Sequence, residues 1–276
     1  MCTFASCLKS MNKGLYILLI AILMVSCSDF QKTFRSEDTA AKFKMGTELF
    51  EAGKYSKAHR MFNQILPKYR GKPQAEKLTF MHAMSSYKMK DYYFASYHFD
   101  KFTDVYPQSE KAEEAAFLSA KGYYYNSPVY SKEQKETVEA IEKLQLFVNQ
   151  YPNSQYLEEA NKLVRELDFK LEKKAFEIAK QYDLIRDYKA SVKSFNNFLF
   201  DFPGSSLREE ALYYRLHAEY NLALLSVDSL KENRLNIAVN YYKAFVKAYP
   251  NSEFLEEASQ WNKTLNEELE KFKTKI

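Results

Sequence analysis

Glycine and proline are scarce in this chain of 276 residues, which holds six and seven of them. So few turn-forming residues argue against a fold of sheets and tight turns, and against several glycine-rich phosphate-binding loops. GxGxxG, P-loop and HExxH patterns are absent, and no cysteine lies beyond Cys27. The four histidines, His59, His82, His98 and His217, fall on separate predicted helices. The sequence therefore predicts no catalytic site, no metal site and no bound cofactor.

The chain also lacks a large excess of positive or negative charge. Charged residues make up 28% of the chain, they are mixed in sign, and the net charge is only +4. No clustered basic stripe of the kind that binds nucleic acid is present. Aromatic residues are abundant instead, with 22 Tyr and 21 Phe. This composition favours helices that bury large side chains.

The N-terminus carries a pattern typical of exported proteins. A short positive segment, Met11–Lys13, precedes the apolar run LYILLIAILMV (Leu15–Val25). Eleven apolar residues are too few to span a bilayer, but they suit the core of a signal peptide. We interpret residues 1–26 as this signal peptide; Met1 and Met11 are both candidate starts, and the ten residues before Met11 add nothing to the pattern.

The residues that follow, LMVSC, resemble the lipobox of bacterial lipoproteins. In that family the signal is cut before the cysteine, which here implies that acyl chains such as palmitate are attached to Cys27. Residues 27–38 would then form a lipidated linker. The alternative is an ordinary signal peptide followed by a chance cysteine.

A decapeptide recurs four times in the rest of the chain. Each copy has an aromatic residue and proline, then Ser two residues after the proline and Glu-Glu-Ala at six to eight residues. The prolines are 45, 51 and 47 residues apart, and a degenerate fifth copy starts at Tyr69. Self-similarity with this period indicates a helical array. The four prolines are Pro107, Pro152, Pro203 and Pro250.

The residues before each copy have helical periodicity. Twelve positions before the proline slot the side chain is small, and eight and five positions before it the side chain is large. These offsets share one face of an α-helix, which proline then ends because it lacks an N–H. We predict that the serine is the N-cap of the next helix and that the two glutamates lie near its positive end.

The pattern resembles the tetratricopeptide repeat (TPR), most clearly in Met45–Leu66 and Lys174–Pro203. The resemblance implies an all-α solenoid of about five helical hairpins from Asp38 to the C-terminus. We divide it into N-terminal TPR units, residues 39–125, and C-terminal TPR units, residues 126–276.

In TPR families the first helix of each repeat lines a concave groove. The corresponding helices here carry aromatic pairs seven residues apart, two turns on one helix face. An apolar, aromatic-containing peptide would suit such a groove. The alternative is that these side chains pack in the core between repeats. The candidate groove residues are Phe43, Phe50, Phe80, Tyr87, Phe117 and Tyr124.

The lipobox, the five repeats and the YPNSQY segment together resemble the BamD family of lipoproteins. That resemblance implies a non-enzymatic, lipid-anchored scaffold on the periplasmic face of the outer membrane. Its partners would be unfolded outer-membrane proteins, bound in the N-terminal groove, and a BamA-like barrel subunit. The resemblance makes residues 39–125 the units with the substrate groove and residues 126–276 the partner-binding half, in which the basic residues Arg186, Lys189 and Lys193 would face that subunit.

Two other interpretations remain open from the sequence. One is another periplasmic TPR lipoprotein that acts in cell-wall or envelope coordination. The other is a lipoprotein enzyme or sugar-binding protein, which would need a polar pocket for which this glycine-poor, repeat-filled chain leaves no room.

Overall fold

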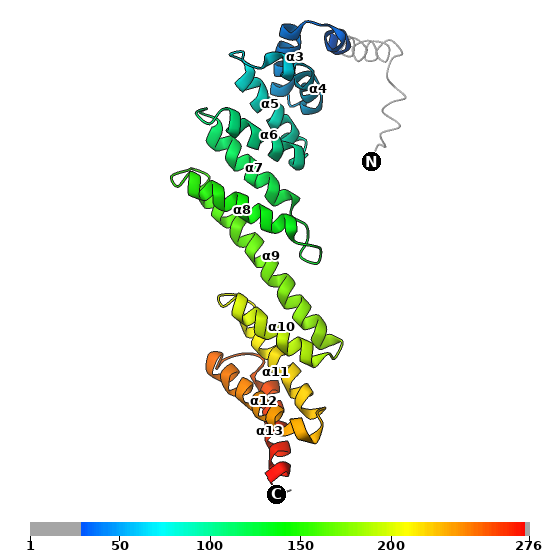
Figure 1. Ribbon diagram of the computed structural model, residues 1–276, viewed down its shortest axis with the longest axis vertical. Helices are drawn as coiled ribbons and strands as arrows, with labels where there is room; N and C mark the ends of the chain where they lie inside the picture. Colours follow the sequence, from blue (N-terminus) through cyan, green and yellow to red (C-terminus); the bar gives the residue numbers. More distant parts are fainter. Residues whose placement is uncertain (1–28, 274–276) are drawn as a thin grey trace, which may run out of the picture. The chain divides into compact units, whose positions relative to one another are not determined.

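The structure, a computed structural model, describes residues 29–273. All regular elements in this range are helical, which confirms the predicted all-α class. They are α3 (Thr39–Glu51), α4 (Tyr55–Ile65), η1 (Leu66–Tyr69), α5 (Ala75–Lys88), α6 (Tyr92–Val105), α7 (Ala112–Asn126), α8 (Lys135–Gln150), α9 (Leu157–Leu184), α10 (Tyr188–Asp201), α11 (Arg208–Leu224), α12 (Asp228–Ala248) and α13 (Leu255–Lys273). Residues 29–35 are helical as well. Figure 1 shows consecutive helices packed side by side as hairpins.

The helices form two compact units. The first contains the described residues up to Asn126 together with Glu142–Ala160, and the second contains Ser127–Ile141 and the residues from Asn161 onward. Within the first unit α3 packs on α4, α5 on α6 and α6 on α7. Within the second unit α10 packs on α11, α11 on α12 and α12 on α13.

The turn inside a hairpin is built the same way three times. Gly53, Lys90 and Arg186 have φ angles of 71°, 63° and 64°, the left-handed region that closes a helix C-terminus. In the last two turns the next residue, Asp91 or Asp187, accepts a hydrogen bond from a backbone N–H of the following helix. The tight turn forces the two helices to run antiparallel.

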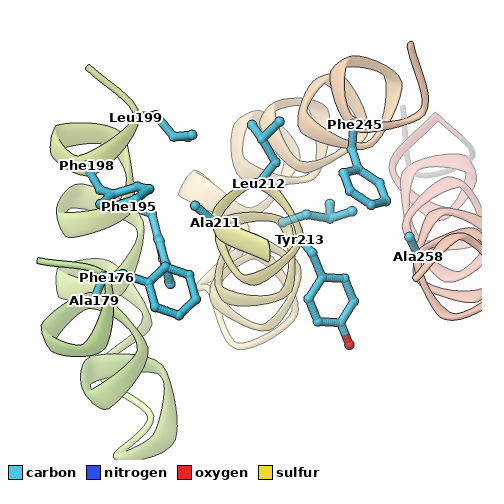
Figure 2. Close-up of a cluster of buried hydrophobic side chains, with 11 residues drawn as sticks. Phe176, Ala179, Phe195, Phe198, Leu199, Ala211, Leu212, Tyr213, Phe245 and Ala258 are labelled. Atoms are coloured by element: carbon cyan, nitrogen blue, oxygen red, sulfur yellow. The ribbon is translucent and has the colours of Figure 1, made fainter. Parts of the chain in front are cut away.

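The small and large positions before each proline form the core, as predicted. Every small residue in the series is buried, and each large residue is buried except Tyr242, which is partly exposed. Small residues let neighbouring helices approach closely while the aromatic rings fill the remaining space. In the second unit Phe195, Phe198 and Phe245 belong to one cluster with Phe176 and Tyr213 (Figure 2).

The glutamate pairs lie in the first turns of α7, α9, α11 and α13, as predicted. The serines are not helix N-caps, however, since each helix begins three residues after its serine. Each serine hydroxyl instead accepts the N–H two residues on and closes a turn. Ser109 and Ser154 also donate to Glu76 and Glu113 of the preceding hairpin.

Candidate functional site

The six predicted groove residues all lie in the first unit, and five of them are partly buried. Phe43 is partly buried and stacks on Tyr69, with ring centroids 5.5 Å apart. Phe50 and Phe80 are partly buried on α3 and α5. Tyr87 and Tyr124 lie near the C-terminal ends of α5 and α7 and are also partly buried. These five side chains are partly accessible to solvent, whereas Phe117 is buried.

Phe50 and Phe80 line a pocket of about 550 Å³. Met81 and Phe102 complete its apolar wall, and Pro73 closes one side. The Phe80 ring is held in place by Phe99 and Phe102 of α6, at centroid distances of 5.7 and 5.5 Å. A volume of this size can hold an aromatic side chain together with part of its backbone. Four charged residues border the pocket: Glu51, Glu76, Lys77 and Lys111.

One residue in the turn after α6 distinguishes this pocket from the equivalent place in two other hairpins. In the corresponding turns of two other hairpins, the fourth residue after the proline is aromatic. It covers the ring that is equivalent to Phe80 in that hairpin. Tyr156 stacks on Phe117 at 4.5 Å, which leaves Phe117 2% exposed, and Phe254 stacks on Tyr213 at 4.4 Å. The residue at this position above Phe80 is Lys111. Phe117 therefore packs in the core and does not line the groove.

Lys111 gives the pocket a cationic edge. Its ammonium group lies 5.5 Å from the centroid of the Phe80 ring, within the range of a cation–π contact. The same group forms a 2.8 Å ion pair with Glu114, and this hydrogen bond raises the pKa of Lys111. Glu76 accepts a hydrogen bond from Ser109. With Glu76 and Lys111 engaged in these contacts, Lys77 is the cation that an incoming anion can meet.

Tyr87 belongs to a tyrosine cluster next to this pocket. Its ring contacts Tyr92 and Tyr125 at 5.4 and 6.5 Å, and Tyr92 and Tyr125 stack on each other at 4.4 Å. Burial, with the neighbouring phenols, raises the pKa of Tyr87 well above its usual range. The Tyr87 phenol therefore stays neutral at physiological pH, and the three rings continue the aromatic surface beyond Phe80.

The second unit has no comparable opening above Tyr213. Trp261 of α13 lies over this surface and contacts Tyr213, His217 and Tyr220 at 5.2, 5.1 and 5.7 Å. The aromatic pair Tyr213 and Tyr220 is thus covered by the last helix. The repeat pattern does not reveal this cover, although Trp261 is the only tryptophan of the chain.

The predicted partner residues all lie in the second unit, at and just after the turn that follows α9. Arg186 is in the turn between α9 and α10, and Lys189 and Lys193 are one turn apart on α10. All three are exposed. Sequence reasoning missed two apolar neighbours, Leu184 and Ile185, which are 70% and 60% exposed. The turn thus presents both apolar and basic side chains to solvent.

Two further predictions concern the membrane and metals. Cys27 and the signal peptide lie outside the described residues. No helix within residues 29–273 has the length and apolar character to cross a bilayer. In the same range no three His, Cys, Asp or Glu side chains are arranged to hold a metal ion.

Comparison with known proteins decides the family. The family model of YfiO, described as outer membrane lipoprotein, matches residues 35–235. The chain belongs to the YfiO family of outer membrane lipoproteins.

Three relatives carry the name outer membrane protein assembly factor BamD. The protein from Haemophilus influenzae is 23% identical over 225 residues, which cover 78% of this chain and 86% of that protein. The protein from Caulobacter vibrioides is 20% identical over 211 residues, 75% of this chain and 69% of that protein. The protein from Helicobacter pylori is 32% identical over 69 residues, 25% of this chain and 31% of that protein.

The YfiO match includes the residues of the Phe80 pocket and the basic turn at Arg186. It ends before Trp261, so the helix that covers Tyr213 lies outside the matched region. The pocket and the turn thus both lie in the part of the chain that the family model matches.

Proposed function

We propose that this chain is an outer membrane protein assembly factor. In this proposal lipid on Cys27 holds it at the periplasmic face of the outer membrane, where it acts as a scaffold without enzymatic activity. Its family and the names of its relatives support this role.

The first unit would bind unfolded β-barrel proteins. The observation that carries this step is the open pocket between Phe50 and Phe80, since the equivalent ring in two other hairpins is covered. We infer that an aromatic side chain at the end of a substrate chain enters the pocket and that its carboxylate faces Lys77. Phe43, Tyr87 and Tyr124 would contact the residues that precede it.

The second unit would bind a BamA-like barrel subunit through Arg186, Lys189 and Lys193. Leu184 and Ile185 strengthen this assignment because apolar side chains beside cations are common in protein interfaces, where they supply affinity and the charges supply orientation. An acidic surface with an apolar centre is the expected complement.

A peptide-binding assay tests the substrate site. A fluorescent peptide that ends in phenylalanine should bind the chain, and Phe80→Ala should weaken binding about tenfold because it removes the floor of the pocket. Lys111→Tyr should also weaken binding, since it restores the covering ring found at Tyr156. Phe200→Ala, which truncates an 84% exposed ring of the second unit, is the matched control.

The carboxylate contact has its own control. Amidation of the peptide's C-terminus should weaken binding to the parent chain, and Lys77→Gln should make amidated and free peptides bind alike. Equal affinity of the parent chain, Phe80→Ala and Lys111→Tyr would show that the pocket is not the substrate site.

Affinity purification from membranes tests the partner site. Recovery of a BamA-like protein, lost on reversal of charge at Arg186, Lys189 and Lys193, is the expected result. Recovery of cell-wall enzymes without a barrel subunit would instead favour a lipoprotein of envelope coordination.

A further inference from the structure

A second aromatic surface lies on the opposite side of α6 from the pocket. Tyr93, Phe94 and Tyr97 are 75%, 54% and 54% exposed, and Met89 before them is 37% exposed. Phe99 and Phe102 of the same helix are fully buried. The three rings present roughly 350 Å² of surface, the size at which an apolar patch on a soluble protein is commonly functional.

Basic residues of α4 border this patch. Met89 shares a hollow of about 410 Å³ with Lys54, Tyr55 and Lys57. Lys57 and Arg60 are exposed, and α4 contains no acidic residue. Asp91 is the one carboxylate in the turn before α6, and it caps that helix. The surface is therefore apolar at its centre and net positive at its edge.

The two helices are joined by a row of three histidines. His59 of α4 stacks on His82 of α5 at 4.4 Å, and His82 meets His98 of α6 at 4.6 Å. His98 in turn contacts Phe94 and Tyr97 at 6.4 and 5.4 Å. This row packs α6 near α4, and the hollow that Met89 shares with Lys54 and Lys57 brings the basic and the aromatic residues to one face at the surface.

The start of the described chain lies against the same face. The Arg60 guanidinium is 4.7 Å from the centroid of the Phe34 ring, and the Lys57 ammonium is 5.4 Å from that of Phe30. Phe30 is only 6% exposed and also stacks on Phe34, with ring centroids 5.6 Å apart. Only two residues separate Phe30 from Cys27. A lipid on Cys27 would therefore enter a bilayer next to Lys57 and Arg60.

We propose that this face, made of Met89, Tyr93, Phe94 and Tyr97 with Lys54, Lys57 and Arg60, lies in the headgroup region of an anionic phospholipid bilayer. The inference rests on the proposed lipidation of Cys27. Tyrosine and phenylalanine rings partition into the interface, and lysine and arginine gain from nearby anionic headgroups. The lipid keeps the face at high local concentration near the bilayer, so that weak contacts suffice to orient the unit.

The orientation has a consequence for the substrate pocket. Phe102 lines the pocket and lies on the buried side of α6, away from Tyr93 and Tyr97. A bilayer against the exposed side of α6 would leave the pocket open to the periplasm. Membrane contact would thus hold the pocket in a position to receive unfolded chains.

Fluorescence quenching by brominated phospholipid tests the proposal on the lipidated chain in vesicles with about 30% phosphatidylglycerol. The variants are Phe94→Trp and, as a matched control, Phe200→Trp, which replaces an 84% exposed ring of the second unit. The parent chain gives the baseline, because Trp261 is its only tryptophan. We expect at least twofold greater quenching for Phe94→Trp than for Phe200→Trp. Equal quenching would overturn the proposal.

Vesicle flotation of the unlipidated Cys27→Ser chain measures how strongly the face binds a bilayer without the lipid anchor. This chain should bind vesicles with phosphatidylglycerol more than neutral ones, and the triple variant Tyr93→Ser, Phe94→Ser, Tyr97→Ser should bind them less than the parent. Circular dichroism checks that the variant is folded. Equal flotation of parent and triple variant would contradict the proposal.

Two further readouts separate this inference from its alternatives. A photoreactive residue at position 94 that cross-links in cells to a protein rather than to lipid would show that the face binds a protein partner, and would also overturn the proposal. The triple variant should still bind the phenylalanine-ended peptide, so loss of membrane contact and loss of substrate binding are distinguishable. Mass analysis of Cys27 tests the lipidation separately.

Discussion

His82 carries a prediction about pH. It is 1% exposed on α5, and neither ring nitrogen has a hydrogen-bond partner within the described structure. Burial, followed by repulsion from His59 and His98, lowers the pKa of His82 to about 3. Burial also lowers the pKa of His59 and His98, with Asp91 acting in the opposite direction. All three rings are therefore held neutral by the fold.

The magnitude follows from proton linkage. In the unfolded chain a histidine has a pKa of about 6.5. Below that pH the unfolded state binds a proton at His82, whereas the folded state does not. The free energy of unfolding should fall by about 1.4 kcal/mol per pH unit from about pH 6.5 down to about pH 3. His82 alone then accounts for a loss of about 2 kcal/mol between pH 7 and pH 5. His59 and His98 change the stability in the same direction.

Replacement by a ring that cannot titrate isolates this contribution. We expect His82→Phe to reduce the stability difference between pH 7 and pH 5 by about 2 kcal/mol, because phenylalanine keeps the ring contacts and binds no proton. Urea unfolding followed by circular dichroism measures the free energy of unfolding of the whole chain at each pH. Hydrogen exchange of α5 peptides, corrected for intrinsic rates, shows whether the change resides in the first unit. An equal pH response of parent and variant would refute the reasoning.

Three further substitutions test the packing, each by urea unfolding. Gly122→Ala should cost about 1–3 kcal/mol because its Cβ would overlap Ser96 Oγ, whereas Gly204→Ala, with open space around it, should be nearly neutral. Glu219→Gln should stabilise the chain by about 1 kcal/mol at pH 7 and have no effect at pH 4. Burial raises the pKa of Glu219, so its ionised form destabilises the fold only above the usual carboxyl range of pH. Trp261→Ala should cost about 2–4 kcal/mol by uncovering Tyr213, and a smaller loss would show that α13 is not a structural cover.

The helical repeat could be predicted from the sequence because its signals are local. A proline ends a helix through its own ring, and the small and large positions before it lie within four turns of the same helix. The serines were misassigned as N-caps because a serine hydroxyl accepts a backbone N–H in the same way in a turn and at a helix start. The prediction that each serine accepts a backbone N–H is correct, but the helix begins three residues later than predicted.

The sequence by itself determined which aromatic residues occupy equivalent positions, and the tertiary structure alone decided which of them is accessible. Phe80 and Phe117 stand at the same place in successive hairpins, yet Lys111 leaves the first ring partly open while Tyr156 buries the second. The covering residue lies 31 residues beyond Phe80 and 39 beyond Phe117. Burial depends on contacts between residues that distant, so periodicity within one helix could not predict it.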